Sequence, residues 1–162
     1  MHPSESPSIV QYYDIHGPIA ERDRVVYLDE FGFDQIRENL SRIILGDMVI
    51  RRSAAVTAQY DRYVIELSQL GHTPADCIWE LAQGSPIFLV ENMFPYNVPD
   101  ANHFVLFQMD PHISIDELQK YLSKWMREKN LENDDVILYQ NAPLCRSVNE
   151  YPHFQIFVRR CK

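Results

Sequence analysis

The chain has 162 residues and a formal net charge of −8, and 46% of its residues are hydrophobic. This length and composition predict one domain with a substantial core, because a disordered chain of this size would contain fewer apolar residues. The acidity argues against a protein whose main task is to bind nucleic-acid phosphates or an anionic membrane, so we expect no nucleic-acid partner.

The N-terminal segment differs from the rest of the chain in amino-acid composition. Residues 1–20 contain Pro3, Pro7 and Pro18 among serines and tyrosines, a composition that disfavours a helix. We predict that residues 1–20 form an extended or partly ordered arm. Residues 21–162 are then expected to form a single domain.

The first half of that domain is predicted to be mostly helical. Apolar residues at helical spacing indicate a helix over 34–45 that ends at Gly46. Ser53 is a capping residue for a longer helix to about residue 70. The sequence Thr73-Pro74-Ala75-Asp76 has a capping hydroxyl, a proline at the first helical position and an acid three residues after the cap, so it predicts a helix to about Gln83.

The second half of the domain is predicted to contain two strands, a helix and two further strands. Runs rich in β-branched and aromatic residues predict strands over 86–92, 103–109, 136–141 and 153–160. An amphipathic helix is predicted to begin at Ser114, between the second and third of these strands. The expected fold is therefore α+β, with a helical N-terminal half and an antiparallel sheet of at least four strands.

The patterns of cysteine, histidine and hydropathy indicate the cellular compartment and limit the kinds of binding site that the chain can form. The three cysteines form no CxxC pair, which favours reduced thiols in an intracellular compartment, the cytoplasm or nucleus, or a virion if the protein is viral. No segment reaches the ~18 apolar residues of a membrane span, so no membrane insertion is expected. The six histidines show no HxH or HxxxH spacing, and no glycine-rich phosphate loop is present. We expect no metal and no cofactor.

Two near-identical segments, HFVLF at 103–107 and HFQIF at 153–157, raise the question of a histidine-based site. Alternate residues of a strand share a face, so His153 and Gln155 are predicted to point the same way. A two-histidine phosphoesterase needs a hydroxyl two residues after each histidine. Val105 and Gln155 occupy those positions, which excludes that class.

The C-terminal half also resembles the histidine-triad nucleotide hydrolases and transferases in layout. The resemblance rests on the segment ENMFPYNVPDANHFVLF, a strand that ends at Asn141, and a final strand that begins at His153. In that family the middle histidine of the final strand attacks the α-phosphate. Gln155 stands in its place here, and an amide cannot carry a phosphoryl group. The resemblance therefore implies a similar sheet without the covalent mechanism.

Six residues remain candidates for binding a ligand. Their donor groups would surround a phosphate or a sugar if they met at one face of the sheet. The alternative is that the histidines bond to backbone groups at strand ends and orient loops. The candidates are His103, Asn141, Arg146, Ser147, His153 and Gln155.

A second resemblance covers about residues 40–160. The motifs, in order, are Arg51-Arg52-Ser53, Tyr60 and Tyr63, Asn92 to Tyr96, His103, Asn141, Arg146-Ser147-Val148 and His153. They resemble the family known as domain of unknown function 3605, found mainly in fungi and also in other eukaryotes and large DNA viruses. The family pattern has an acid where this chain has Met93, and a histidine where it has Gln155. The resemblance implies the fold and the order of motifs, and no reaction.

Two functions stay open at this point. The first is a non-catalytic interaction or structural protein with a protein partner, for example a component of a large assembly such as a virus particle. The second is a small nucleotide- or phosphate-handling enzyme or sensor, with His153 as acid or base, Asn141 and Ser147 as donors, and Arg146 as a charge clamp.

Overall fold

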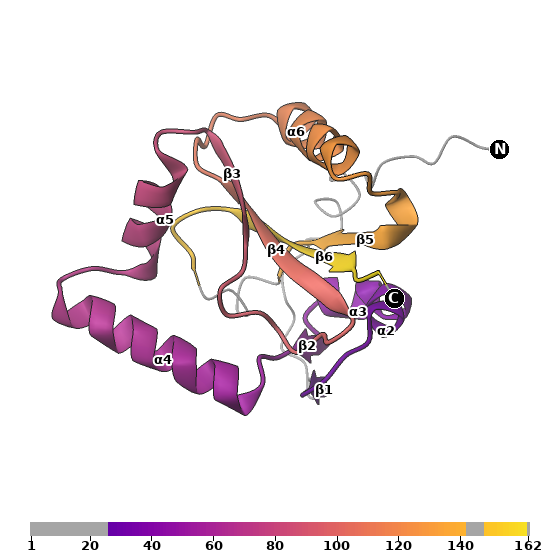
Figure 1. Ribbon diagram of the computed structural model, residues 1–162, viewed down its shortest axis with the longest axis horizontal. Coiled ribbons are helices and arrows are strands. Elements are labelled where there is room, and N and C mark those ends of the chain that lie inside the picture. The colour runs from indigo at the N-terminus through magenta and orange to yellow at the C-terminus, as the bar shows by residue number, and fades with distance from the viewer. Residues whose placement is uncertain (1–25, 142–147, 162) are drawn as a thin grey trace.

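The computed structural model describes residues 26–141 and 148–161. It is an α+β fold in which helices flank a four-stranded antiparallel sheet (Figure 1). The predicted arm over 1–20 and the candidate residues Arg146 and Ser147 lie outside the described residues. In the part of the chain that is described, no helix is long and apolar enough to cross a membrane.

The sheet is built from the four segments that the sequence predicts as strands. They are β3 (Ile87–Glu91), β4 (Ala101–Gln108), β5 (Val136–Tyr139) and β6 (His153–Arg159), in the spatial order β3-β4-β6-β5. Every neighbouring pair is antiparallel, and β4 faces β6 in a register that pairs Val105 with Gln155. The predicted fold class is therefore confirmed.

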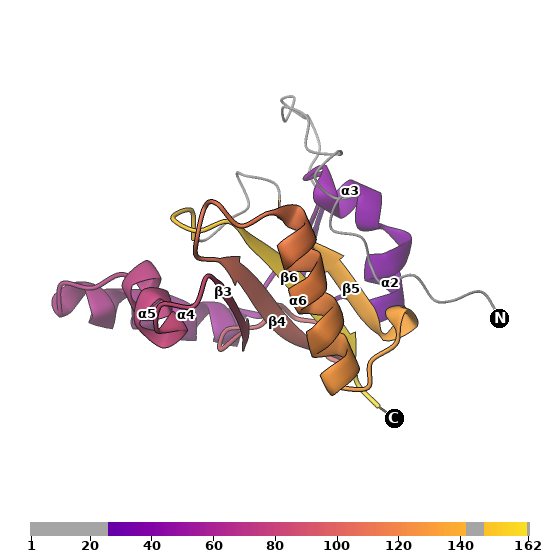
Figure 2. The ribbon, with the colours of Figure 1, turned by 90° about the horizontal axis from the view of Figure 1, so that it is seen from above.

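Helix α6 (Ile115–Glu128) covers one face of the sheet, as Figure 2 shows. The Ser114 hydroxyl begins the helix by accepting a hydrogen bond from the Glu117 N–H at 3.1 Å. Leu118, Leu122 and Met126 form its buried stripe and pack against strand residues that alternate with the residues of the opposite face. These strand residues are Leu106, Val136, Leu138, Phe154, Ile156 and Val158.

The opposite face is covered in two parts, and the first is the N-terminal region. It contains β1 (Val26–Leu28), α2 (Phe33–Glu38), α3 (Leu40–Ile44) and β2 (Met48–Ile50). Its apolar side chains pack against Ile137, Tyr139 and Phe157 of the sheet to form a core in which Phe31, Phe33 and Ile36 are fully buried.

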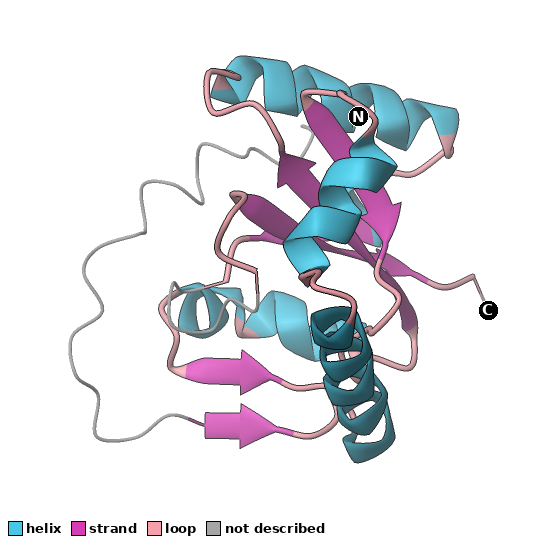
Figure 3. Ribbon diagram, turned by 90° about the vertical axis from the view of Figure 1, so that its left-hand side faces the viewer, coloured by secondary structure: helices cyan, strands magenta, loops and turns pink. Residues whose placement is uncertain are grey.

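This region corrects two details of the sequence prediction. The single helix expected over 34–45 is two helices, because the chain leaves helical geometry at Asn39, where ψ is 15° and the side-chain amide donates to the Gln35 carbonyl. In addition, β1 and β2 form a parallel pair that the sequence did not predict (Figure 3). Each of these strands has three residues, which is too short for an alternating pattern to be recognised.

The second part is a helical arm, here defined as α4 (Ala54–Gln69) and α5 (Pro74–Ala82) with the turn between them. Ser53 caps α4, and Thr73 with Asp76 forms the predicted capping box of α5. Gly71, in the turn, has a φ of 77°, which favours glycine. The arm projects from the β3 side of the sheet (Figures 1 and 2), and none of the α4 residues is buried.

Candidate functional site

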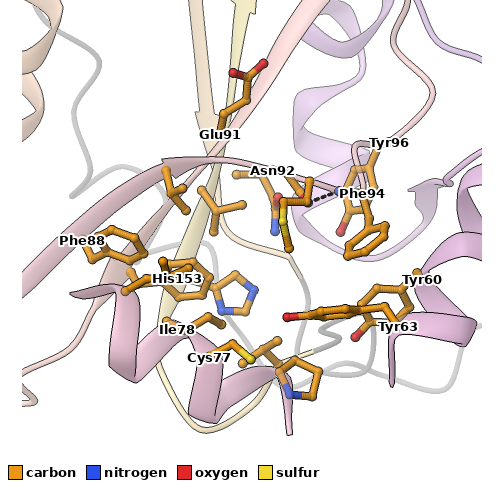
Figure 4. A pocket seen from close by; sticks show the side chains of 18 of the residues that line it. Tyr60, Tyr63, Cys77, Ile78, Phe88, Glu91, Asn92, Phe94, Tyr96 and His153 are labelled. Carbon is orange, nitrogen blue, oxygen red and sulfur yellow. Dashed lines mark hydrogen bonds between the residues drawn. The ribbon is translucent and has the colours of Figure 1, made fainter. Parts of the chain in front are cut away.

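A cavity of about 170 Å³ lies between the helical arm and the part of the sheet that the arm faces. Its walls are mostly apolar and aromatic: Tyr60 and Tyr63 come from α4, Cys77 and Ile78 from α5, and Phe88 from β3. Figure 4 shows these side chains around one space, with His153 of β6 among them. The remaining described residues of the lining are Arg52, Pro74, Leu81, Val90, Glu91, Asn92, Met93, Phe94, Tyr96, Val105, Phe107, Val148 and Gln155.

His103 and Gln155 form a buried hydrogen-bonded pair behind this cavity. The backbone N–H of Tyr96 donates to Nδ1 of His103 at 3.1 Å, so Nδ1 carries a lone pair and the proton of the neutral ring is on Nε2. Nε2 then donates to Oε1 of Gln155 at 2.5 Å. The ring stacks on Phe157 with 4.4 Å between centroids. Both ring nitrogens of His103 are therefore engaged within the fold.

Burial lowers the pKa of His103 to about 4 from its ordinary value of 6.5. The bond to Gln155 acts in the opposite direction, and the nearby positive charge of Arg52 lowers the pKa further. His103 is consequently neutral at physiological pH, and only 3% of it is exposed. These properties suit a structural histidine that holds the Tyr96 turn in place.

His153 lies at the other end of the same face. Its Nδ1 donates to the Tyr151 carbonyl at 3.0 Å, and its ring lies 5.4 Å from that of Phe107. In the β4–β6 register His103 pairs with Phe157, four residues from His153, so the two histidines are separated by about 13 Å along the strand. The similar segments HFVLF and HFQIF do not form one two-histidine site.

Asn141 and Arg52 each form a hydrogen bond with a residue of the turn that contains Tyr96. The Asn141 amide donates to the Tyr96 hydroxyl at 2.7 Å. Nε of Arg52 donates to the Phe94 carbonyl at 2.8 Å, and the guanidinium lies 4.4 Å from the centroid of the Tyr60 ring. The centroid of the Phe94 ring lies 5.4 Å from that of Tyr60 and 5.0 Å from that of Tyr63.

Tyr63 is the tyrosine whose acidity the cavity changes. Burial raises the pKa of Tyr63 to about 12, and the neighbouring Cys77 thiol contributes in the same direction. The phenol of Tyr63 therefore stays protonated. A nucleophile or base would need a lowered pKa, so the raised pKa argues against those two roles for Tyr63.

Of the predicted site residues, His103 and Gln155 are in direct contact, Gln155 and His153 line the cavity, and Asn141 reaches the same region through Tyr96. The sequence did not predict Arg52, Tyr60, Tyr63 and Phe94 as site residues. Tyr60 and Tyr63 are three residues apart in a helix, which places them on one side of α4. Their partner Phe94 is more than thirty residues away, and no local pattern indicates that contact.

The described residues offer no group of three or more histidine, cysteine, aspartate or glutamate side chains that could hold a metal ion. Cys77 is a free thiol in the cavity wall, and Cys161 is a free thiol at the surface.

Comparison with known proteins gives a fold and no function. No protein-family model matches the chain, and no curated protein matches it. A solved structure described as "Crystal Structure of HTC1" is similar, with a TM-score of 0.55 and 17% sequence identity. The match covers 81% of this chain and 86% of that chain. At this identity the likeness shows that the two chains share a fold and nothing more.

Proposed function

We propose that the protein is a non-catalytic interaction protein and that the helical arm is the surface on which its partner protein docks. The observation that carries the proposal is α4, a helix of 16 residues without a buried residue. An isolated helix of this length is only marginally stable in water, and helices in proteins gain most of their stability by burying an apolar face. A partner that covers α4 would supply that burial.

The exposed apolar side chains of the described residues concentrate on this arm and the turn between its helices. Ile65 is 58% exposed, Leu70 73% and Trp79 59%. Large apolar side chains grouped on one element are typical of interaction surfaces, and tryptophan is a common anchor. The same arm carries four carboxylates (Asp61, Glu66, Asp76 and Glu80) and one arginine, Arg62. The complementary partner is therefore a protein with an apolar patch rimmed by basic residues.

Site-specific photo-crosslinking in the cells that contain the protein tests this docking surface. We expect a photoreactive residue at Ile65 to form a discrete adduct with one protein, and the adduct to decrease when Trp79→Ser is added. The matched control is Lys124 on α6, whose side chain is also exposed. Equal labelling from positions 65 and 124, or no adduct from position 65, would contradict the proposal.

A small nucleotide- or phosphate-handling enzyme or sensor is the second candidate. Arg52 favours it, because it is a cation that lines the same cavity as His153. Against it stand the apolar lining, the raised pKa of Tyr63 and the engagement of His103 within the fold. A phosphate needs several converging donors and positive charges. The geometry therefore supports the interaction protein better.

We further infer membership of the family known as domain of unknown function 3605, in a degenerate form. The convergence of the motif residues supports this inference: Arg52 bonds to Phe94, Tyr96 bonds to His103, and His103 bonds to Gln155. Motifs that are scattered in the sequence but adjacent in space are expected when they form one site. A role in a large assembly such as a virus particle is one version of the proposed function, and it follows from the viral members of that family.

A further inference from the structure

The cavity beneath the helical arm is about large enough for one aromatic ring. Its volume of about 170 Å³ is comparable to the ~150 Å³ apolar cavity that accommodates a benzene molecule. Drug-sized ligands occupy larger sites, of about 300–1,000 Å³. Tyr60, Tyr63, Phe88, Phe94 and Phe107 line the space, and their rings suit edge or offset contacts with another ring.

Arg52 gives this apolar cavity a charged rim. Its side chain is half-buried, and one of its five N–H groups donates to the Phe94 carbonyl. No carboxylate of the described residues lies within ion-pair distance of it. Glu91, the acidic residue of the described lining, points away from the other side chains in Figure 4. The guanidinium therefore retains donors that form no ion pair with a carboxylate of the described residues.

Stacking fixes the position of this guanidinium. It lies 4.4 Å from the Tyr60 ring centroid and 5.4 Å from that of Tyr96. Tyr60 in turn lies 5.4 Å from Phe94, so the charge is about one ring width from the aromatic walls. An anchored arginine binds a carboxylate with little further loss of side-chain freedom, and the planar guanidinium fits two carboxylate oxygens at once.

We propose that the cavity binds a small organic carboxylate with a ring-sized apolar body. The ring occupies the space between the arm and the sheet, and the carboxylate lies on Arg52. A single cation matches a singly charged carboxylate better than a dianionic phosphate, which requires more donors. Small anions without an apolar body gain nothing from the walls, and the net charge of −8 on the chain repels them.

The probe is 3-phenylpropionate, titrated into the full chain while backbone amide NMR signals are followed. We expect saturable shifts at Tyr60, Phe88 and Phe107. The neutral 3-phenylpropanamide has the same ring and tests the charge on the unaltered protein. We expect it to bind about tenfold to a hundredfold more weakly, the range given by one charge-assisted hydrogen-bonded pair.

Two arginine variants test the position of the charge. Arg52→Gln should weaken binding of the acid by the same factor and leave binding of the amide unchanged. Arg51→Gln is the matched control, because Arg51 is exposed and stacks on Tyr27 at 3.8 Å; it should bind as the unaltered chain does. Far-UV circular dichroism checks that each variant is folded, and the amide comparison remains valid if Arg52→Gln is not.

Equal affinity for the acid and the amide would overturn the carboxylate site. Equal weakening by the two arginine variants, or no shifts at millimolar probe, would do so as well. Ile65 is not part of the cavity lining, so this experiment and the crosslinking experiment succeed or fail independently.

Discussion

Replacing Phe157 with alanine should lower the free energy of unfolding by about 3–5 kcal/mol, the usual cost of deleting a buried aromatic side chain. Phe157 is fully buried and lies where the N-terminal region meets the sheet. Its ring stacks on His103 at 4.4 Å and on Tyr139 at 6.1 Å. Because Phe157 is fully buried, the void would be closed to water, and the close-packed surroundings would relax only partly to fill it.

Phe88→Ala is the matched control for this effect. Phe88 is a half-buried phenylalanine on the same face of the sheet, and its side chain borders the open cavity. We expect a loss of about 1–2 kcal/mol, because water can enter the space that the ring leaves. Denaturant unfolding measures both values. Equal costs for the two variants would contradict the placement of Phe157 in the core beneath the N-terminal region.

Acidification should destabilise the protein through His103. The pKa of His103 is lowered by burial to about 4 in the folded chain, against 6.5 when it is unfolded. Between these values the unfolded chain binds more protons than the folded chain. The contribution of His103 to the free energy of unfolding is therefore fully present above pH 6.5 and is lost as the pH falls toward 4. A difference of about 2.5 units corresponds to a loss of about 3 kcal/mol at pH 4.

The variant His103→Gln isolates this contribution from that of the carboxylates. Its free energy of unfolding, measured from pH 7 to pH 4, should decline less steeply than that of the unaltered chain, with the difference close to 2 kcal/mol at pH 5. His112→Gln changes an exposed histidine and should leave the pH dependence as it was. Parallel curves for the unaltered chain and His103→Gln would show that His103 titrates normally.

The sequence predicted the sheet and three of the helices because their signals are local. Runs rich in β-branched and aromatic residues indicate β4 and β6, and the capping residues Ser53, Thr73 and Ser114 mark the starts of α4, α5 and α6. The break at Asn39 was not predicted, because a single asparagine within an apolar helical pattern does not by itself mark a helix end. The pair β1–β2 was not predicted, because strands of three residues are too short to show a pattern.

The candidate site was predicted less well, since it is defined by tertiary contacts. Spacing alone correctly placed His153 and Gln155 on one face of the sheet, and it drew attention to His103. It did not predict that the β4–β6 register would join His103 to Gln155 and separate it from His153. The cavity also depends on Arg52 reaching Phe94 across 42 residues, for which no periodic pattern exists.

The central claim is that α4 has no buried residue in the isolated chain and becomes buried against a partner protein. Hydrogen exchange of the α4 backbone amides, measured on the purified chain and on the complex recovered through the Ile65 crosslink, tests it most directly. We predict fast exchange in α4 relative to β4 in the isolated chain, and strong slowing of α4 in the complex with α6 unchanged. Equally slow exchange in α4 and β4 of the isolated chain, or no slowing in the complex, would contradict the account.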